Sequence, residues 1–313
     1  MVQLTSHASA PVESAVAAPG APVDRLGLLC HRSDPQDVFP TGLTRLTDTQ
    51  FSVSAHWPMV HRFFAPVGGS HQDPLLIAET IRQATMLIAH AELGVPVGDA
   101  FVMWELGYTC ASERLVLGED PWDITVDASC SRIRRRGRSL GSMSIELLFH
   151  RRGTVLASGA GRVSCTSAGA YRRLRGHRGA ALDTPVPLLP ALPPRAVGKL
   201  SERDVVLAPA VSPGRWPLRL DTRHPTLFGR PNDHVPGILL VEAARQAATA
   251  TLPGFLPAAM QADFHRYVEL DRPCWIEVLP APAGGEVSDG LRIRAVQDGE
   301  TVFTCTLGAP DAA

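Results

Sequence analysis

Two stretches of the chain carry the same polar residues at the same spacing, and this repeat constrains the fold more than any other feature. The shared residues are His61, His71, Glu79, Arg82 and Gln83 in the first stretch and His224, His234, Glu242, Arg245 and Gln246 in the second. Both stretches follow the pattern His-x9-His-x7-Glu-x2-Arg-Gln-Ala, and they lie 163 residues apart. Such a repeat indicates that the fold unit is about half of the chain and is used twice.

Each repeat ends in a segment that the sequence predicts to be a buried helix. Residues 236–248 are rich in good helix formers, and this segment is apolar on nearly all sides. Pro236 suits a first helical turn. In the first copy Asp73 can cap the helix, Pro74 can occupy its first position, and the helix is expected to reach about Ala89.

The Glu, Arg and Gln of each repeat lie at positions i, i+3 and i+4, so each trio shares one helix face. On an exposed helix, such a Glu–Arg pair would contribute only about 0.2–0.5 kcal/mol. On a buried helix, charged groups need a partner or a cavity. The duplicated trios on apolar helices therefore favour a functional role.

Strand patterns surround each predicted helix. They cover residues 51–55, 123–128, 142–149 and 154–164 in the first half and 216–220, 275–278, 291–296 and 301–307 in the second. The Asp298-Gly299 pair between two such runs is a strong hairpin signal. Each half thus has a strand, a long buried helix and several antiparallel strands. The expected fold is α+β: a tandem hotdog in which each central helix is wrapped by an antiparallel sheet, with one continuous sheet across both halves.

Composition suggests where the domains begin and end. Residues 1–24 are rich in Ala, Pro, Val and Ser and are predicted to be a disordered tail. Five prolines between positions 185 and 194 favour an extended linker over residues 171–200. The N-terminal hotdog domain is therefore expected at residues 25–170 and the C-terminal one at 201–309.

Several classes of protein are disfavoured. A net charge of −1 gives no sign of a nucleic-acid binder. The chain has no long apolar run that would span a membrane and no signal-peptide pattern. Its six cysteines are scattered without a CxxC pair, which disfavours a zinc site and a disulfide framework. We expect a cytoplasmic bacterial protein with no metal, no cofactor and cysteines that only pack.

The densest charge cluster lies at Arg132, Arg134, Arg135, Arg136 and Arg138. It is either a solvated hairpin tip or a docking site for an acidic partner such as an acyl carrier protein, with residues 134–136 as the contacts.

Two resemblances extend these predictions. The helix after Pro236-Gly237, preceded by His224 and Gly229-Arg230-Pro231, resembles the central helix of hotdog hydroxyacyl-carrier-protein dehydratases. From about residue 28 to 308 the chain more closely resembles the A-factor (γ-butyrolactone autoregulator) synthase family. The matching motifs are His31-Arg32, Asp37-Val38-Phe39, His61-Arg62-Phe63-Phe64, His71-Gln72-Asp73-Pro74, Arg223-His224-Pro225, Phe228-Gly229-Arg230-Pro231 and Asp233-His234-Val235-Pro236-Gly237, together with both helical trios.

The second resemblance implies a defined reaction. Such enzymes transfer a β-ketoacyl group from an acyl carrier protein thioester to a hydroxyl of dihydroxyacetone phosphate. The ester then condenses to a phosphorylated butenolide, and some relatives make furan-type signals instead. Acyl chain length and the choice between a monomeric pseudo-dimer and a homodimer stay open.

The residues suit this chemistry. Glu79 or Glu242 could act as the base, if burial raises its pKa, with His71 or His234 sharing a proton. Backbone N–H groups near Gly237 could face the thioester oxygen. Arg82 or Arg245 could bind the phosphate. The substrate-binding candidates are Gly237, Gln246, Gln83, His224 and Arg230.

Because its helix follows Pro-Gly, the second half is expected to carry the chemistry through Glu242 and Arg245. No nucleophile is evident, so we expect direct acyl transfer. One alternative is a thioesterase or dehydratase acting on carrier-bound or coenzyme A acyl chains, which would not depend on dihydroxyacetone phosphate. Another is a non-catalytic acyl-ligand binding protein, which would have no need of buried charges.

Overall fold

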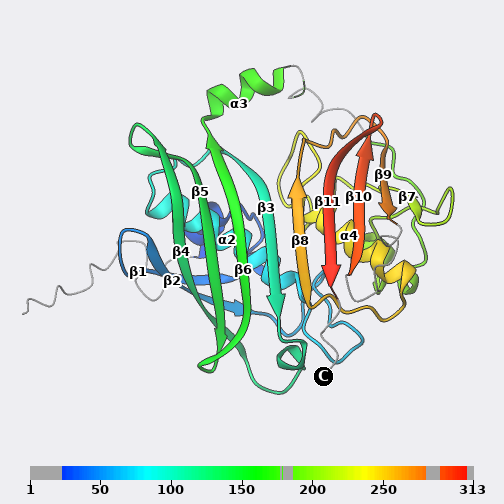
Figure 1. Ribbon diagram of the computed structural model, residues 1–313, viewed down its shortest axis with the longest axis horizontal. Helices are drawn as coiled ribbons and strands as arrows, with labels where there is room; N and C mark the ends of the chain where they lie inside the picture. Colours follow the sequence, from blue (N-terminus) through cyan, green and yellow to red (C-terminus); the bar gives the residue numbers. More distant parts are fainter. Residues whose placement is uncertain (1–22, 177, 179–185, 280–289, 309–313) are drawn as a thin grey trace, which may run out of the picture.

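The computed structural model describes residues 23–176, 178, 186–279 and 290–308. Within these residues the strands form one 11-stranded sheet in the order β1-β2-β4-β5-β6-β3-β8-β11-β10-β9-β7 (Figure 1). The first half contributes β1 (Pro40–Arg45), β2 (Gln50–Trp57), β3 (Ala100–Cys110), β4 (Trp122–Arg136), β5 (Ser139–Arg151) and β6 (Thr154–Thr166). The second half contributes β7 (Arg215–Pro217), β8 (Ala259–Phe264), β9 (Cys274–Val278), β10 (Leu291–Gln297) and β11 (Glu300–Gly308).

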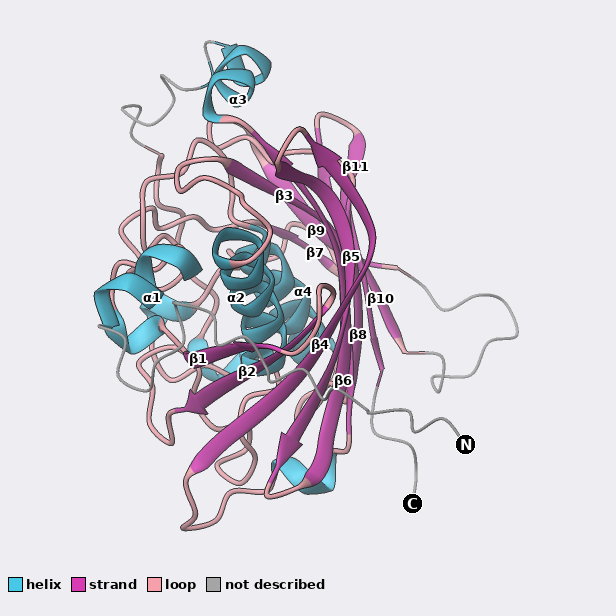
Figure 2. Ribbon diagram, turned by 90° about the vertical axis from the view of Figure 1, so that its left-hand side faces the viewer, coloured by secondary structure: helices cyan, strands magenta, loops and turns pink. Residues whose placement is uncertain are grey.

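Two long helices, α2 (Leu75–Ala91) and α4 (Gly237–Thr251), lie side by side on the same face of the curved sheet (Figures 1 and 2). Nearly all residues of both helices are buried, as their apolar sequences predict. The shorter helix α1 (Val23–Cys30) packs on α2, and α3 (Ala168–Arg175) follows β6 at one end of the sheet. Each half is a hotdog, and the fold prediction is confirmed.

The halves join where β3 pairs antiparallel with β8, from Glu105 opposite Asp263 to Thr109 opposite Ala259. Gly107 suits this pairing, because a Cβ there would lie 3.0 Å from the Met260 backbone carbonyl, a tight contact. The continuous sheet is therefore made by two strands that the sequence patterns did not reveal. In β3 the register shifts between Met103 and Glu105, which interrupts the alternation that marks a strand.

Most predicted strands exist and extend a few residues beyond the expected bounds, whereas three strands (β1, β3 and β8) were missed. The strand predicted at residues 216–220 is wrong in extent, because β7 ends at Pro217. A proline has no N–H to donate to a ladder and is suited to an edge strand, which β7 is.

The predicted boundaries need correction in three places. Residues 1–22 of the expected tail lie outside the described residues, but residues 23 and 24 belong to α1. The linker expected at 171–200 begins as helix: Ser167 caps α3, which continues to Arg175. Near its end the same segment forms a short 3-10 helix, Pro194–Val197, and the next lysine, Lys199, is buried.

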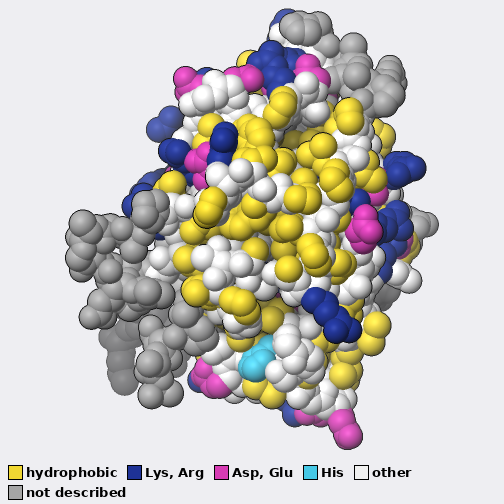
Figure 3. Space-filling model, turned by 90° about the vertical axis from the view of Figure 1, so that its right-hand side faces the viewer, with side chains coloured by type: hydrophobic (Ala, Val, Ile, Leu, Met, Phe, Trp, Pro, Cys, Tyr) yellow, Lys and Arg dark blue, Asp and Glu magenta, His cyan; other side chains and the backbone are white. Residues whose placement is uncertain are grey.

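The arginine run lies at an exposed hairpin tip, which is one of its two expected interpretations: residues 132–136 end β4, and the turn to β5 is at residues 137 and 138. The docking role stays a prediction. On the β7 side, hydrophobic side chains cover much of the surface (Figure 3). Within the described ranges, no helix combines the length and apolarity needed to cross a bilayer.

Candidate functional site

The carboxylate of Glu79, on α2, is the centre of a buried ion cluster. Arg82 donates to both of its oxygens at 2.9 and 2.6 Å, and Arg32 donates to Oε1 at 3.0 Å. Gln83 donates to Oε1 as well, at 2.6 Å. These four residues are referred to below as the Glu79 cluster.

The same arrangement surrounds Glu242 on α4. Arg245 donates to both carboxylate oxygens at 2.9 and 2.6 Å, and Gln246 donates at 2.6 Å. Lys199 lies 3.1 Å from Oε1, in the place that Arg32 takes in the first half. These residues form the Glu242 cluster.

The expectation that burial raises the pKa of the two glutamates is wrong. Burial does oppose ionisation, but Arg32 and Arg82 outweigh it and lower the pKa of Glu79 to about 2. Arg245 and Lys199 lower the pKa of Glu242 to about 2 in the same way. Both carboxylates are therefore anions at neutral pH with no tendency to accept a proton, and neither suits a general base.

The two glutamines support the backbone. The amide of Gln83 accepts from the Phe39 N–H and donates to the Asp37 carbonyl. Gln246 makes the same pair of bonds with Val206 and Asp204. Both side chains are fully buried, so the structure gives them a supporting position rather than the predicted contact with substrate.

His224 is also a supporting residue. Its Nδ1 accepts the N–H groups of Thr226 and Leu227, and its Nε2 lies 3.0 Å from the Asp204 carboxylate. His61 repeats this pattern in the first half, with Nε2 3.1 Å from Asp37. These histidines fix the turns that follow them and have no surface left for a ligand.

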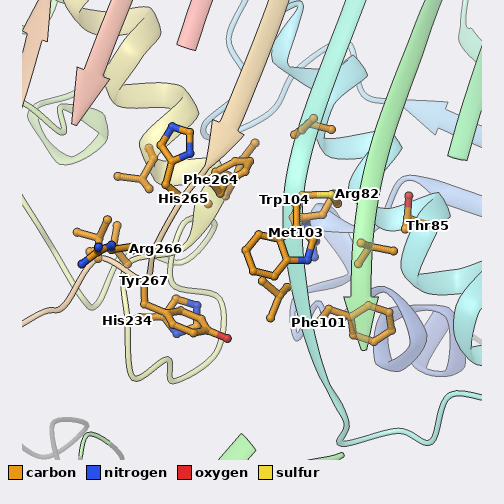
Figure 4. Close-up of a pocket in the computed structure, with 18 of the residues that line it drawn as sticks. Arg82, Thr85, Phe101, Met103, Trp104, His234, Phe264, His265, Arg266 and Tyr267 are labelled. Atoms are coloured by element: carbon orange, nitrogen blue, oxygen red, sulfur yellow. The ribbon is translucent and has the colours of Figure 1, made fainter. Parts of the chain in front are cut away.

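An apolar cavity of about 390 Å³ lies between the two helices and the β3–β8 junction (Figure 4). Figure 4 shows Phe264 and Tyr267 from the β8 side facing Phe101 and Trp104 from the β3 side. Arg82 and His234 reach this apolar cavity, and the rest of its lining is largely hydrophobic.

A second pocket of about 130 Å³ shares Arg82, His234 and the first residues of α4 with the apolar cavity. Arg32 and Arg230 complete its cationic lining, and it is called the basic pocket below. Burial, together with the neighbouring Arg82 and Arg32, lowers the pKa of Arg230 to about 10. Three guanidinium groups therefore line this pocket, and Glu79 is the carboxylate that pairs with two of them.

The N-terminus of α4 opens into both pockets. Among the described residues, the N–H groups of Gly237 and Ile238 donate to no other protein group, while the Leu239 N–H donates to the Pro236 carbonyl. Free N–H groups at a helix N-terminus attract anions. A Cβ at position 237 would lie 3.0 Å from the Phe264 ring, so glycine leaves room for this ring against the helix N-terminus.

His234 stands at this N-terminus in a hydrogen-bonded chain. Its Nδ1 lies 2.7 Å from Asp233 Oδ1, which also accepts from the Tyr171 hydroxyl at 2.7 Å. Arg175 donates to the other oxygen of Asp233 at 2.9 Å. Burial raises the pKa of Asp233, but hydrogen bonds from His234, Arg175 and Tyr171 outweigh it and hold that pKa well below its usual range.

The geometry favours a site shared by the two halves over one built on the expected pair, Glu242 and Arg245. Neither of these residues lines either pocket, and the Arg245 side chain is 4% exposed against 19% for Arg82. His71, the counterpart of His234, has its Nδ1 2.9 Å from the Ser70 hydroxyl and lines neither pocket. The structure thus brings together Arg82, Arg230, His234 and Gly237.

The second cations of the two clusters, Arg32 and Lys199, were not among the predicted site residues. A signal was present, because Arg32-x4-Asp37 and Lys199-x4-Asp204 share one spacing. The interval from this aspartate to the following histidine is 24 residues in the first half and 20 in the second, which hides the match at a fixed offset. Tyr171 and Arg175 were also missed, because they fall in the predicted linker.

The arginines at 134–136 are exposed on the β4–β5 hairpin, at the same end of the sheet as α3 (Figure 1).

Residues 18–167 and 181–309 match the family profile described as the A-factor biosynthesis hotdog domain. A 2-oxo-3-(phosphooxy)propyl 3-oxoalkanoate synthase from Streptomyces virginiae is 45% identical over 287 residues, covering 91% of this chain and 97% of its own. The synthase of the same name from Streptomyces griseus is 43% identical over 291 residues, with 91% and 95% covered.

Solved structures are similar in fold at low identity. An acyl-ACP thioesterase from Bacteroides thetaiotaomicron aligns with a TM-score of 0.51 and 10% identity, over 83% of this chain and 97% of its own. A putative oleoyl thioesterase from Lactobacillus plantarum aligns with a TM-score of 0.50 and 14% identity, over 83% and 95%. At this identity the likeness supports the architecture alone.

Proposed function

Because this chain belongs to the A-factor biosynthesis hotdog domain family, we propose that it is an acyltransferase that makes a 2-oxo-3-(phosphooxy)propyl 3-oxoalkanoate. It transfers a 3-oxoacyl (β-ketoacyl) group from a thioester to a hydroxyl of dihydroxyacetone phosphate. The relatives named above supply the product, and the two adjoining pockets supply the physical argument.

The observation that carries the proposal is the surplus of positive charge beside an apolar cavity. Arg32, Arg82 and Arg230 line the basic pocket, and Glu79 is the carboxylate that pairs with the first two. A dianionic phosphate would be held by these guanidinium groups. The acyl chain would lie in the apolar cavity, so both substrates meet beside His234.

His234 is proposed as the general base. The carboxylate of Asp233 only accepts hydrogen bonds, so Nδ1 of His234 carries the proton and Nε2 keeps its lone pair. Nε2 removes the proton from the attacking hydroxyl as its oxygen bonds to the thioester carbon. When the tetrahedral intermediate collapses, the carbon–sulfur bond breaks and the thiolate takes that proton back.

The oxyanion of the tetrahedral intermediate is proposed to accept the N–H groups of Gly237 and Ile238. Glu79 then has a positioning role instead of the predicted proton transfer: it fixes the guanidinium planes of Arg32 and Arg82 before substrate arrives. The Glu242 cluster is proposed to be structural.

The donor is proposed to be an acyl carrier protein, and the ester is proposed to condense afterwards to a phosphorylated butenolide or a related furan. Carrier proteins are acidic, and the exposed residues Arg134, Arg135 and Arg136 offer the complementary charge. Arg135→Glu should raise KM for a carrier-bound thioester several-fold and leave KM for the coenzyme A thioester unchanged.

The test is a mass-resolved assay of the purified protein with a 3-oxoacyl thioester, with and without dihydroxyacetone phosphate. A phosphorylated ester or butenolide formed only with both substrates supports the proposal. Free 3-oxo acid released regardless of the phosphate would identify a thioesterase. If the protein binds the coenzyme A thioester and the carrier-protein thioester but turns over neither, it is a binding protein.

A further inference from the structure

Tyr267, just after β8, has a buried hydroxyl that no described residue satisfies. Its side chain lines the apolar cavity beside His234, and its hydroxyl points toward the β3 side (Figure 4). A buried hydroxyl with no partner costs free energy, and native structures retain few of them. A role in binding would explain why this one is retained.

The Tyr267 ring is held from several sides. The guanidinium of Arg175 lies 4.5 Å above the ring centroid. The rings of His234 and Tyr171 meet it edge-to-face at 4.7 and 6.2 Å. Contacts of this kind fix a ring in place, so the direction of the hydroxyl is set before a ligand binds.

Other polar side chains of the apolar cavity already have partners. Thr85 donates to the Ile81 carbonyl, and Trp104 donates to the Ser164 hydroxyl. His265 lies 3.0 Å from the Thr304 hydroxyl, and Arg266 is paired with Glu300. Within the described part of the chain, Tyr267 is thus the uncommitted donor among the cavity's polar side chains.

The position of Tyr267 selects the ligand group. It lines the apolar cavity and not the basic pocket, so it lies on the acyl side of His234. Burial raises the pKa of Tyr267, which keeps the hydroxyl protonated and able to donate. In a 3-oxoacyl thioester, the second carbonyl lies two carbons beyond the thioester carbon, along the chain that enters this cavity.

We propose that the Tyr267 hydroxyl donates a hydrogen bond to the 3-oxo oxygen of the acyl group and thereby selects 3-oxoacyl over unsubstituted acyl chains. This inference rests on the acyl-transfer function proposed above. A site built around such a donor disfavours an analogue that lacks the acceptor, because the donor then stays unpaired in the complex.

The experiment compares Tyr267→Phe with the wild-type enzyme on a 3-oxoacyl thioester and on the saturated thioester of the same length. The variant should lose roughly 10- to 100-fold in kcat/KM for the 3-oxoacyl substrate and less than about twofold for the saturated one. Equal losses with both substrates, or no loss with either, would overturn the proposal.

Tyr108→Phe is the matched control. Tyr108 is fully buried, and its hydroxyl donates to the Pro257 carbonyl at 3.3 Å, outside the apolar cavity. Removal of this hydroxyl should leave the preference for the 3-oxoacyl over the saturated substrate unchanged.

The affinities of non-cleavable thioether analogues of both substrates provide a readout that needs no acceptor. If dihydroxyacetone phosphate is not the acceptor, a preference for the 3-oxo analogue that disappears in Tyr267→Phe still supports the role of this residue. Equal wild-type affinities for the two analogues would count against it.

Discussion

The Glu79 and Glu242 clusters share the same hydrogen bonds between Glu, Arg and Gln, but they differ in the charged groups around them. Three guanidinium groups line the basic pocket, and the carboxylate of Glu79 pairs with two of them. Around Glu242, the cations Lys199 and Arg245 lie close to a second carboxylate, that of Asp73. Asp73 is fully buried, and its pKa is raised by burial although Arg245 and Lys199 oppose that shift. The cations of the Glu242 cluster thus have a further acidic group close by, whereas no described Asp or Glu lines the basic pocket.

The difference comes from positions where the repeat breaks. Counting back 163 residues, Pro236 corresponds to Asp73 and Gly237 to Pro74. Asp73 accepts the Leu75 N–H through its side chain, and Pro74 has no N–H to offer. The N-terminus of α2 is therefore capped from within, whereas the N-terminus of α4 stays open to a ligand.

Arg230 corresponds in the same count to Val67, so the second cluster also lacks the third cation. Residues that match between the halves build the shared core, and residues that differ decide which of the two clusters adjoins an open pocket. The comparison can be tested with variants made in pairs.

The largest effect is expected at the two histidines before the helices. His234→Gln removes the proposed base and should lower kcat by about 10²–10⁴-fold, the usual contribution of a positioned acid or base. His71→Gln, at the equivalent position, should change kcat by less than about twofold, because His71 lines neither pocket. Steady-state kinetics on both purified variants decide this, and equal losses would remove the distinction between the halves.

The helical arginines should separate activity from stability. Arg82→Met should lower kcat/KM by roughly 10- to 100-fold through the loss of charged hydrogen bonds to substrate. Arg245→Met should lower the free energy of unfolding by about 3–5 kcal/mol, since it breaks a buried ion pair, and leave kcat/KM of the folded enzyme near wild type. Urea titrations and kinetics corrected for the folded fraction measure both quantities. A catalytic defect confined to Arg245→Met would reverse the assignment.

The repeat, the buried helices and the tandem hotdog followed from sequence because spacing and apolarity are local properties. The ionisation of Glu79 and Glu242 did not, since it depends on Arg32 and Lys199, which a shift in the repeat register conceals. The cap at Asp73 was predicted and is confirmed. The pocket itself was not predictable, because it depends on a tertiary arrangement that brings Arg82 of α2 next to Arg230 and the N-terminus of α4.

A smaller effect is expected when Arg230 of the basic pocket is replaced by valine, the residue at the equivalent position 67. Arg230→Val should raise KM for dihydroxyacetone phosphate by about 10-fold, the loss of one charged contact of modest strength. Inorganic phosphate should raise the Tm of the wild-type protein by binding the folded state, and this rise should shrink in the variant. Val67→Arg is the control for adding charge in the other half, and it should bind no further phosphate because Asp73 and Pro74 remain.

The smallest difference is expected in acid, where the two clusters should behave alike. The pKa values of Glu79 and Glu242 are about 2 in the folded protein against an ordinary value of 4.5. A carboxylate with a lowered folded-state pKa stabilises the fold above its unfolded pKa, and this stabilisation is lost as pH falls from 4.5 toward 2. Asp73, whose pKa is raised, contributes with the opposite sign.

Glu79→Gln and Glu242→Gln should therefore each flatten the fall in the free energy of unfolding over this acid range, by similar amounts, although only the Glu79 cluster adjoins the proposed substrate pockets. Urea titrations at a series of pH values measure the slope, with the exposed Glu113→Gln as a variant that should match wild type. If Glu242→Gln left the slope unchanged while Glu79→Gln reduced it, the two clusters would differ in ionisation as well as in access to the pockets. Their shared hydrogen bonds would then not explain their contribution to stability.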